Sequence, residues 1–211
     1  MFPLRDNIAS KSFPFVTVAL IAANALVFWH ELTLGRRLGP FLDAHGLVPA
    51  HPSVEDLVTS MFLHGGWTHA IGNLWTLWIF GDNVEDRLGH LRFLGFYLLC
   101  GLAAGGAQML AAPASTIPVI GASGAIAGVL GAYVLFFPTA KVTTVVPVLI
   151  FLHYAEIPAF MYLGVWFFTQ LYAGTLSLGA NFGGVAWWAH IGGFAAGLVF
   201  GFRHRRRRRT T

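Results

Sequence analysis

Two glycine-rich stretches decide the fold: Gly121-Ala-Ser-Gly-Ala-Ile-Ala-Gly-Val-Leu-Gly131 and Ala189-His-Ile-Gly-Gly-Phe-Ala-Ala-Gly-Leu-Val-Phe-Gly201. Both contain small residues four positions apart, a spacing that lets the backbones of transmembrane helices approach closely. Each stretch also carries a polar residue near its start, Ser123 in the first and His190 in the second. We therefore expect two packed membrane helices that bring a serine hydroxyl within hydrogen-bond reach of an imidazole, which activates a weak alcohol nucleophile.

The composition supports a membrane protein, because 56% of the residues are hydrophobic, only 10% are charged, and the apolar residues form long blocks. A bilayer core of about 30 Å needs roughly 20 helical residues to cross it. By that measure we predict an all-α, polytopic membrane protein, a single domain over residues 1–211 with six transmembrane helices. The expected spans are near 13–29, 67–82, 92–111, 119–137, 157–173 and 185–202.

Basic residues predict the orientation. They precede the first span, lie between spans two and three, follow span four, and fill the tail 203–211. The positive-inside rule then places both termini in the cytoplasm of a multi-pass cell-membrane protein. An arginine run can also bind nucleic acid, but directly after a transmembrane helix we expect a cytoplasmic stop or an anionic-lipid contact, and no nucleic acid partner. The small six-span plan favours a bacterial cytoplasmic membrane.

Two connections are long enough to need an interpretation. The first loop, about 30–66, is too apolar for a disordered linker, and we expect it to fold partly at the outer membrane interface. We interpret 139–155 as a cytoplasmic or interfacial connection, with the fifth span beginning near Ile157.

Polar residues gather near the outer ends of spans two, four and six. Ser123 is expected about one turn inside span four and His190 about two turns inside span six, at similar depth. His69 and Asn73 lie four residues apart in span two and therefore share one helix face. Polar groups at membrane depth are costly and usually functional. The pattern predicts acyl transfer, with an Asn amide, a His N–H and a backbone N–H near Ser123 as candidate donors to an oxyanion.

Other interpretations of these residues are weaker. Gly-Xaa-Ser-Gly taken alone is more often a packing device. His64 and His69 are five residues apart, about 140° around a helix, so they do not form a helical metal pair. Without an HExxH pattern we expect no metal and no cofactor. No carboxylate lies beside spans four and six, which favours a Ser–His dyad.

Three motifs resemble those of the rhomboid family of intramembrane serine proteases: His64-Gly-Gly-Trp-Thr-His69-Ala-Ile-Gly-Asn73, Gly121-Ala-Ser123-Gly124 and Ala189-His190-Ile-Gly-Gly193-Phe-Ala-Ala-Gly197. Gly81–Gly89 is similar to the family's turn after span two. The resemblance extends over essentially the whole chain.

The resemblance implies a six-helix bundle with a water-filled cavity open to the outside. It implies Ser123 as nucleophile, His190 as general base, and an oxyanion hole formed by His69, Asn73 and the Ser123 backbone N–H. The remaining roles it implies are structural: His64 supports the hole from the loop, and Gly193 and Gly197 hold span six against span four. It further implies a single-pass transmembrane substrate, cut near its outer end, that enters past a gate formed by span five and the loop after it.

The chain departs from the family pattern at two places. Some members carry a Trp-Arg pair in the first loop, where this chain has Glu55-Asp56. Some carry an aromatic residue one turn after the serine that stacks on the histidine; here that position is Ala127. Two outcomes are open: Trp187 or Trp188 orients His190 instead, or the His190 ring is held less firmly.

Two other functions compete with the protease. A catalytically silent relative would bind transmembrane helices without cutting them, but the presence of both Ser123 and His190 argues against it. A channel or carrier would need polar residues that continue to the cytoplasmic face, yet the inner halves of spans four and six are almost wholly apolar. The expected partners are therefore single-pass membrane proteins and the lipid bilayer.

Overall fold

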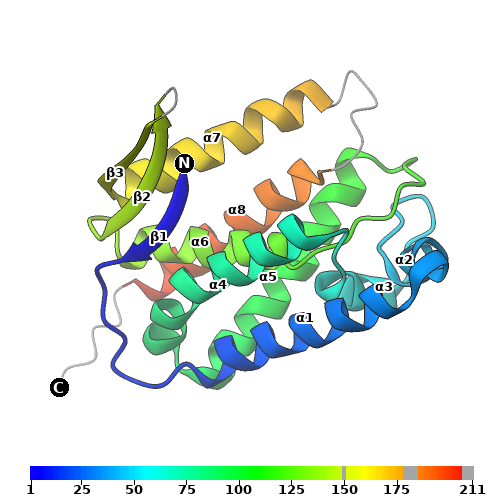
Figure 1. Ribbon diagram of the computed structural model, residues 1–211, viewed down its shortest axis with the longest axis horizontal. Helices are drawn as coiled ribbons and strands as arrows, with labels where there is room; N and C mark the ends of the chain where they lie inside the picture. Colours follow the sequence, from blue (N-terminus) through cyan, green and yellow to red (C-terminus); the bar gives the residue numbers. More distant parts are fainter. Residues whose placement is uncertain (149–150, 178–184, 206–211) are drawn as a thin grey trace.

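A computed structural model describes residues 1–148, 151–177 and 185–205 (Figure 1). These residues are predominantly helical. In chain order the α-helices are α1 (Phe15–Thr33), α2 (Leu38–His45), α3 (Val54–Thr59), α4 (Trp67–Leu88), α5 (His90–Ala111), α6 (Ser123–Phe136), α7 (Ala159–Ser177) and α8 (Trp187–His204). Two 3-10 turns, η1 (Gly35–Arg37) and η2 (Ser60–Phe62), and three strands, β1 (Phe2–Asp6), β2 (Lys141–Val148) and β3 (Phe151–Pro158), complete the described elements.

Each expected span overlaps one long helix, namely α1, α4, α5, α6, α7 or α8. By length and composition, α1 and α5 are able to cross a membrane, and α6 is a shorter apolar helix. Membrane crossing by all six therefore stays a prediction. The described part of the tail ends at Arg205, and the rest of the expected basic tail lies outside the described residues.

Helix α6 is shorter than the expected span 119–137 because it begins only at Ser123. Val119 pairs with Leu47 in an isolated β-bridge, so this stretch is extended rather than helical. Gly121 has φ of +122°, a left-handed conformation that glycine adopts without the steric cost of a Cβ atom. The chain therefore turns at Gly121 and starts the helix two residues later.

Helix α6 lies at the centre of the bundle, in direct contact with α4, α5 and α8. Cβ atoms placed on Gly193 and Gly197 of α8 would lie 1.9 Å and 2.0 Å from the carbonyl oxygens of Gly124 and Gly128. Real Cβ atoms do not approach so closely, so only glycine permits this backbone contact. The small-residue spacing thus produces the close pairing of α6 with α8 that it predicts.

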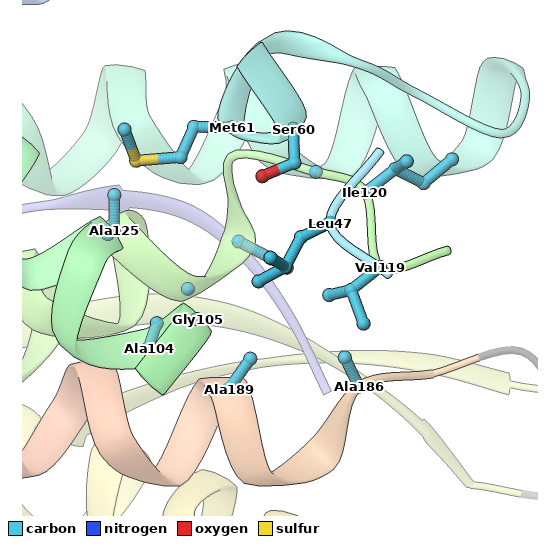
Figure 2. Close-up of a pocket in the computed structure, with 14 residues that line it drawn as sticks. Leu47, Ser60, Met61, Ala104, Gly105, Val119, Ile120, Ala125, Ala186 and Ala189 are labelled. Atoms are coloured by element: carbon cyan, nitrogen blue, oxygen red, sulfur yellow. The ribbon is translucent and has the colours of Figure 1, made fainter. Parts of the chain in front are cut away.

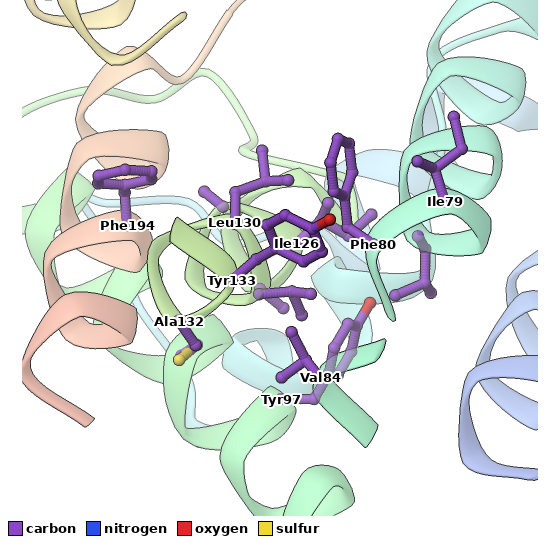
Figure 3. Close-up of a cluster of buried hydrophobic side chains, with 14 of the residues drawn as sticks. Ile79, Phe80, Val84, Tyr97, Ile126, Leu130, Ala132, Tyr133 and Phe194 are labelled. Atoms are coloured by element: carbon purple, nitrogen blue, oxygen red, sulfur yellow. The ribbon is translucent and has the colours of Figure 1, made fainter. Parts of the chain in front are cut away.

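Aromatic side chains fill the core at the end of the bundle where α6 and α8 finish. Figure 3 shows Phe80 of α4 against Tyr133 of α6, and their rings meet edge to face with centroids 4.9 Å apart. Tyr97 of α5 is fully buried in the same cluster. We call this end of the bundle the far end, and the end that carries Ser123 and His190 the site end.

The fold is predominantly helical, as expected, but it is not all-α, because β1, β2 and β3 form an antiparallel sheet in that order (Figure 1). The run Val142-Thr-Thr-Val-Val146 is β-branched throughout, a composition typical of strands. The connection 139–155 therefore consists largely of the paired strands β2 and β3, and α7 begins at Ala159, close to the start expected near Ile157. Its cytoplasmic or interfacial position stays a prediction.

Strand β1 lies lengthwise on α4. The indole Nε1 of Trp75 donates to the Pro3 carbonyl at 2.7 Å, and eight residues further along the helix the Asn83 amide donates to Asp6 at 2.9 Å. Eight helical residues rise about 12 Å, close to the length of a four-residue strand. Since β3 leads directly into α7, the sheet links the far-end half of α4 to the start of α7.

The first loop is folded, as expected: it contains α2 and α3 and contacts the segment that precedes α6. Ser53 caps α3 by accepting from the Asp56 N–H at 3.0 Å, so Glu55 and Asp56 occupy a favourable first helical turn. The Ser60 carbonyl accepts from the Gly121 N–H at 2.8 Å. This bond ties the loop to the turn that positions Ser123.

Candidate active site

Ser123 is the first residue of α6, whereas we expected it about one turn inside a helix. The first N–H groups of a helix have no intrahelical acceptor and point outward along the axis. A helix N-terminus also favours negative charge. Starting α6 at Ser123 therefore places the predicted nucleophile beside backbone donors that have no acceptor within the helix.

His190 lies in the first turn of α8, also nearer its helix start than expected, and its Nε2 is 2.8 Å from Ser123 Oγ. The two residues are 67 positions apart in sequence. Their meeting depends on the glycine contact between α6 and α8, because a side chain at Gly193 would run into the Gly124 carbonyl oxygen and separate the helices. The structure thus brings together the two residues predicted to form the dyad; their catalytic role stays a prediction.

The other imidazole nitrogen, His190 Nδ1, is 2.8 Å from Gln170 Oε1 on α7. Two indole rings flank the imidazole: Trp187 meets it edge-on at 6.2 Å between centroids, and Trp166 of α7 lies at 6.0 Å. Trp187 is one of the two aromatic residues expected beside His190. Trp188, the other, has its indole nitrogen buried without a partner among the described residues.

His69 and Asn73 of α4 point at the turn before Ser123. A Cβ atom on Gly121 would lie 2.5 Å from His69 Nε2 and 3.6 Å from Asn73 Nδ2, so both nitrogens face this glycine. His69 Nδ1 accepts from the Gly65 N–H at 3.4 Å, so a neutral His69 ring carries its proton on Nε2. Asn73 Nδ2 is buried and has no acceptor among the described residues. Two side-chain donors therefore converge close to Ser123.

His64 lies in the loop before α4 and is 1% exposed. Its ring meets the His69 ring at 5.2 Å between centroids, and its backbone N–H donates to Glu31 of α1 at 3.0 Å. Burial, with a further contribution from His69, lowers the pKa of His64 to about 4, so its imidazole is neutral at pH 7. His64 thus packs behind His69, as the resemblance implies, and Glu31 is an anchor that the sequence patterns did not indicate.

A small pocket opens beside Ser123, between α5, α6, α8 and the first loop (Figure 2). Much of its wall consists of small residues, Ala104, Gly105, Ala125, Ala186 and Ala189 among them, with Leu47 and Met61 on the loop side. Apart from the hydroxyls of Ser60 and Ser123, its lining side chains are apolar. Within the described residues, no three His, Cys, Asp or Glu side chains are grouped as metal ligands would be.

Two residues of this site, Gln170 and Trp166, escaped the sequence-based prediction because neither belongs to a recognisable motif. The available signal was Gln170 itself, the one amide side chain within the apolar helix α7. A polar residue at that depth is a functional candidate by default.

The chain matches the Rhomboid domain family over residues 51–207. YdcA, a rhomboid relative from Bacillus subtilis, is 31% identical over 146 residues, which cover 63% of this chain and 68% of YdcA. Mitochondrial rhomboid protein 1 of Saccharomyces cerevisiae is 29% identical over 194 residues, 87% of this chain but 51% of that protein. Rhomboid-like protease 5 of Toxoplasma gondii is 35% identical over 157 residues, 69% of this chain but only 16% of that protein.

The family match covers most of the chain and contains all three motifs as well as the Ser123–His190 contact. The resemblance drawn from those motifs is confirmed: the protein belongs to the rhomboid family.

Proposed function

We propose that this chain is an intramembrane serine endopeptidase that cuts transmembrane helices of other proteins near their outer ends. The observation that carries the proposal is the 2.8 Å contact between His190 Nε2 and Ser123 Oγ at the start of two adjoining helices. A serine hydroxyl becomes an effective nucleophile when a base lies within hydrogen-bond reach of it.

In the first half of the reaction, Ser123 Oγ attacks the scissile carbonyl carbon while His190 Nε2 takes the hydroxyl proton. A new C–O bond forms and the carbonyl electrons move to oxygen. The Ser123 N–H, His69 Nε2–H and Asn73 Nδ2–H are the donors for that oxyanion. His190 then gives its proton to the leaving amine, and the peptide C–N bond breaks.

In the second half, His190 takes a proton from water, and the resulting hydroxide attacks the acyl–Ser123 ester. The oxyanion occupies the same donors. Collapse of this intermediate returns the proton to Ser123 Oγ and releases the carboxylate product. His190 acts as base and acid in each half, so the cycle needs no metal and no cofactor.

The proposed substrate is a single-pass membrane protein, and the pocket beside Ser123 suits small residues at the cut. We further propose that both termini face the cytoplasm, that the site opens to the outer side of a bacterial cytoplasmic membrane, and that α7 and the loop after it form the gate. Part of that loop, 178–184, lies outside the described residues. The basic residues between spans support the orientation.

The alternative is a silent relative that binds transmembrane helices without cutting them. The paired Ser123 and His190 favour the protease, since a binder has no need of a hydroxyl held against an unhindered imidazole nitrogen. Among the relatives, the Toxoplasma gondii protein is named a protease.

The test is cleavage of a single-pass membrane protein with small residues near its outer end, co-reconstituted with the enzyme in liposomes. We expect wild type and Ser177→Ala to produce one mass-mapped cut, and Ser123→Ala to produce none. Ser177 is a matched control because, among the described residues, its hydroxyl bonds to the Gly174 carbonyl alone, at the end of α7. Uncut helix that co-purifies with wild type would instead support the silent binder.

A further inference from the structure

We propose that Gln170 of α7 is the positioning residue of the general base, and that His190 is correctly oriented only while α7 stays packed on α8. The inference rests on the proposed function, since it concerns how that site is prepared for reaction. The group that holds the imidazole comes from a helix that carries none of the three family motifs.

The hydrogen bonds of Gln170 determine which way its amide faces. Its Nε2 donates to the Thr169 hydroxyl at 3.1 Å and to the Trp166 carbonyl at 3.3 Å, both acceptors on its own helix. Its Oε1 is thereby directed at His190 Nδ1, at 2.8 Å. Gln170 is only 6% exposed, so water does not compete freely for this oxygen.

An amide oxygen only accepts hydrogen bonds, so His190 Nδ1 must be the donor. A neutral imidazole carries one proton, and placing it on Nδ1 leaves Nε2 with a free lone pair. That lone pair faces Ser123 Oγ. Gln170 therefore selects the tautomer in which His190 can accept the serine proton, the orienting role that a carboxylate has in a triad.

Gln170 also supplies support for the His190 ring that Ala127 cannot provide. Ala127 is fully buried and too small to support the imidazole. With no aromatic side chain at position 127, the His190 ring is held from α7 instead. Gln170 holds it through a hydrogen bond, and Trp166 through a contact at 6.0 Å between ring centroids. Trp187 of α8 also contacts the ring, edge-on at 6.2 Å between centroids.

Helix α7 contacts the bundle through one stripe of residues. Trp166 and Phe167 pack on Phe194 of α8, at 5.8 Å and 4.8 Å between ring centroids. One turn past Gln170, a Cβ on Gly174 would lie 3.3 Å from Ile191 and Trp187, so the two helices are in close contact there. The opposite face of α7 is exposed: Phe160, Met161, Val165, Phe168, Tyr172 and Leu176.

In Figure 1, α7 runs along one edge of the bundle, and its described neighbours are α6, α8, β2 and β3. Any movement of α7 away from α8 breaks the bond between Gln170 and His190. Substrate entry past α7 and the orientation of His190 are therefore coupled. His190 is correctly oriented only when α7 is packed on α8 again.

The first experiment compares Gln170→Leu, which keeps a side chain of similar bulk but removes the acceptor, with Gln170→Glu, which restores an acceptor oxygen. We expect Gln170→Leu to lower kcat about 10- to 100-fold with little change in KM, and Gln170→Glu to recover part of that loss. The control is Tyr172→Phe on the exposed face of the same helix, which should keep wild-type kcat. A Gln170→Leu enzyme with wild-type kcat would overturn the proposal.

The second experiment needs no variant. In wild type labelled with ¹⁵N-histidine at neutral pH, the His190 resonances, assigned by their absence in His190→Ala, should show a protonated Nδ1 and a bare Nε2. The reverse tautomer would overturn the proposal even if Gln170→Leu failed to fold. If wild type itself fails to cut any substrate in a Ser123-dependent way, the proposed function fails, whereas an active wild type with the reverse tautomer refutes only the role of Gln170.

The third experiment tests the coupling to α7. Gly174→Leu should push α7 away from Ile191 and Trp187 and lower kcat as Gln170→Leu does, and the double variant should be no slower than either alone. Gly164→Leu is the matched control, because nothing lies within 4 Å of a Cβ at that position. Fully additive losses would contradict a shared cause.

Discussion

The two ends of α4 use buried polar groups in opposite ways. At the far end, the Glu85 carboxylate accepts from the Val16 N–H at 2.9 Å, from the Thr17 N–H and hydroxyl at 2.7 Å each, and lies against His90. At the site end, Asn73 Nδ2 is buried with no acceptor among the described residues. The Glu85 carboxylate is thus fully hydrogen-bonded, although the nearby Asn83 amide oxygen has no partner among the described residues, whereas the Asn73 amide keeps a free donor at the site end.

An unsatisfied buried donor costs about 1–3 kcal/mol, so a fold keeps one only where something offsets the cost. At the site end, the proposed compensation is a charge that exists only during reaction, the oxyanion beside Ser123. At the far end no such charge arises, and the bonds hold the start of α1 on α4. On the proposed function, the same helix serves stability at one end and chemistry at the other.

The far end also holds the N-terminal strand. The Asp6 carboxylate accepts from Asn83 and from the Tyr133 hydroxyl, and Ser10 donates to Asp82 at 2.6 Å. Burial raises the pKa of Asp6 to about 6. These contacts join β1, α4 and α6, so polar bonds at the far end connect three elements to one another.

The largest expected effect is a loss of stability at the far end. Glu85→Ala leaves two backbone N–H groups and a hydroxyl without their acceptor in a fully buried place, and should lower the free energy of unfolding by about 3–5 kcal/mol. Thermal unfolding in detergent measures the loss. Glu156→Ala is the control: its ion pair with Lys141 is exposed and contributes about 0–1 kcal/mol. Equal losses in both variants would remove the distinction between the two ends.

The next effect concerns the precision of the site end. Gly193→Ala places a methyl group 1.9 Å from the Gly124 carbonyl oxygen, so α8 must shift and the contact between His190 and Ser123 must lengthen. We expect cleavage to fall at least about 100-fold, the order of loss for a misplacement of 1 Å. Gly72→Ala, where nothing lies within 4 Å of the new Cβ, should cleave at the wild-type rate. Wild-type cleavage by Gly193→Ala would show that the glycine contact does not set the dyad.

Asn73→Ala tests whether the unpaired Asn73 Nδ2 donor stabilises the oxyanion. If Asn73 Nδ2 binds only the oxyanion, its loss should slow cleavage about 10- to 1,000-fold and leave the melting temperature unchanged. The pattern is the reverse of that expected for Glu85→Ala, which reduces stability. An Asn73→Ala enzyme with full activity would remove Asn73 from the site, and one that melts early would make it a structural residue.

The smallest effect is a pH dependence at His64. Because the folded pKa of about 4 lies below the unfolded value of 6.5, the unfolded chain binds more protons between these pH values. The contribution of neutral His64 is complete above pH 6.5, declines as pH falls, and is lost below about pH 4. Between pH 7.5 and pH 5, His64→Leu should therefore lose about 2 kcal/mol less stability than wild type. Parallel pH curves for the two proteins would contradict the burial of a neutral imidazole.

The sequence predicts the site better than it predicts the fold around it. Glycine spacing indicates that α6 meets α8, and the four-residue spacing of His69 and Asn73 puts both on the face that turns to Gly121. Strand β1 pairs Phe2 with Val145, a partner more than a hundred residues away, so no local pattern predicts the sheet. The start of α6 at Ser123 depends on the positive φ of Gly121. Glycine permits this conformation but does not require it, so the sequence alone does not predict the turn. Gln170 belongs to no recognisable motif. Its proposed role depends on which side chain of α7 faces His190, and the sequence does not determine this.

The central claim, that His190 activates Ser123, is tested most directly by labelling the purified protein with a fluorophosphonate probe, which reacts with activated serines. We expect wild type to be labelled, and Ser123→Ala and His190→Ala, with melting temperatures close to wild type, to remain unlabelled. Labelling of Ser123→Ala as strong as wild type, or no labelling of folded wild type in either detergent or lipid, would contradict it.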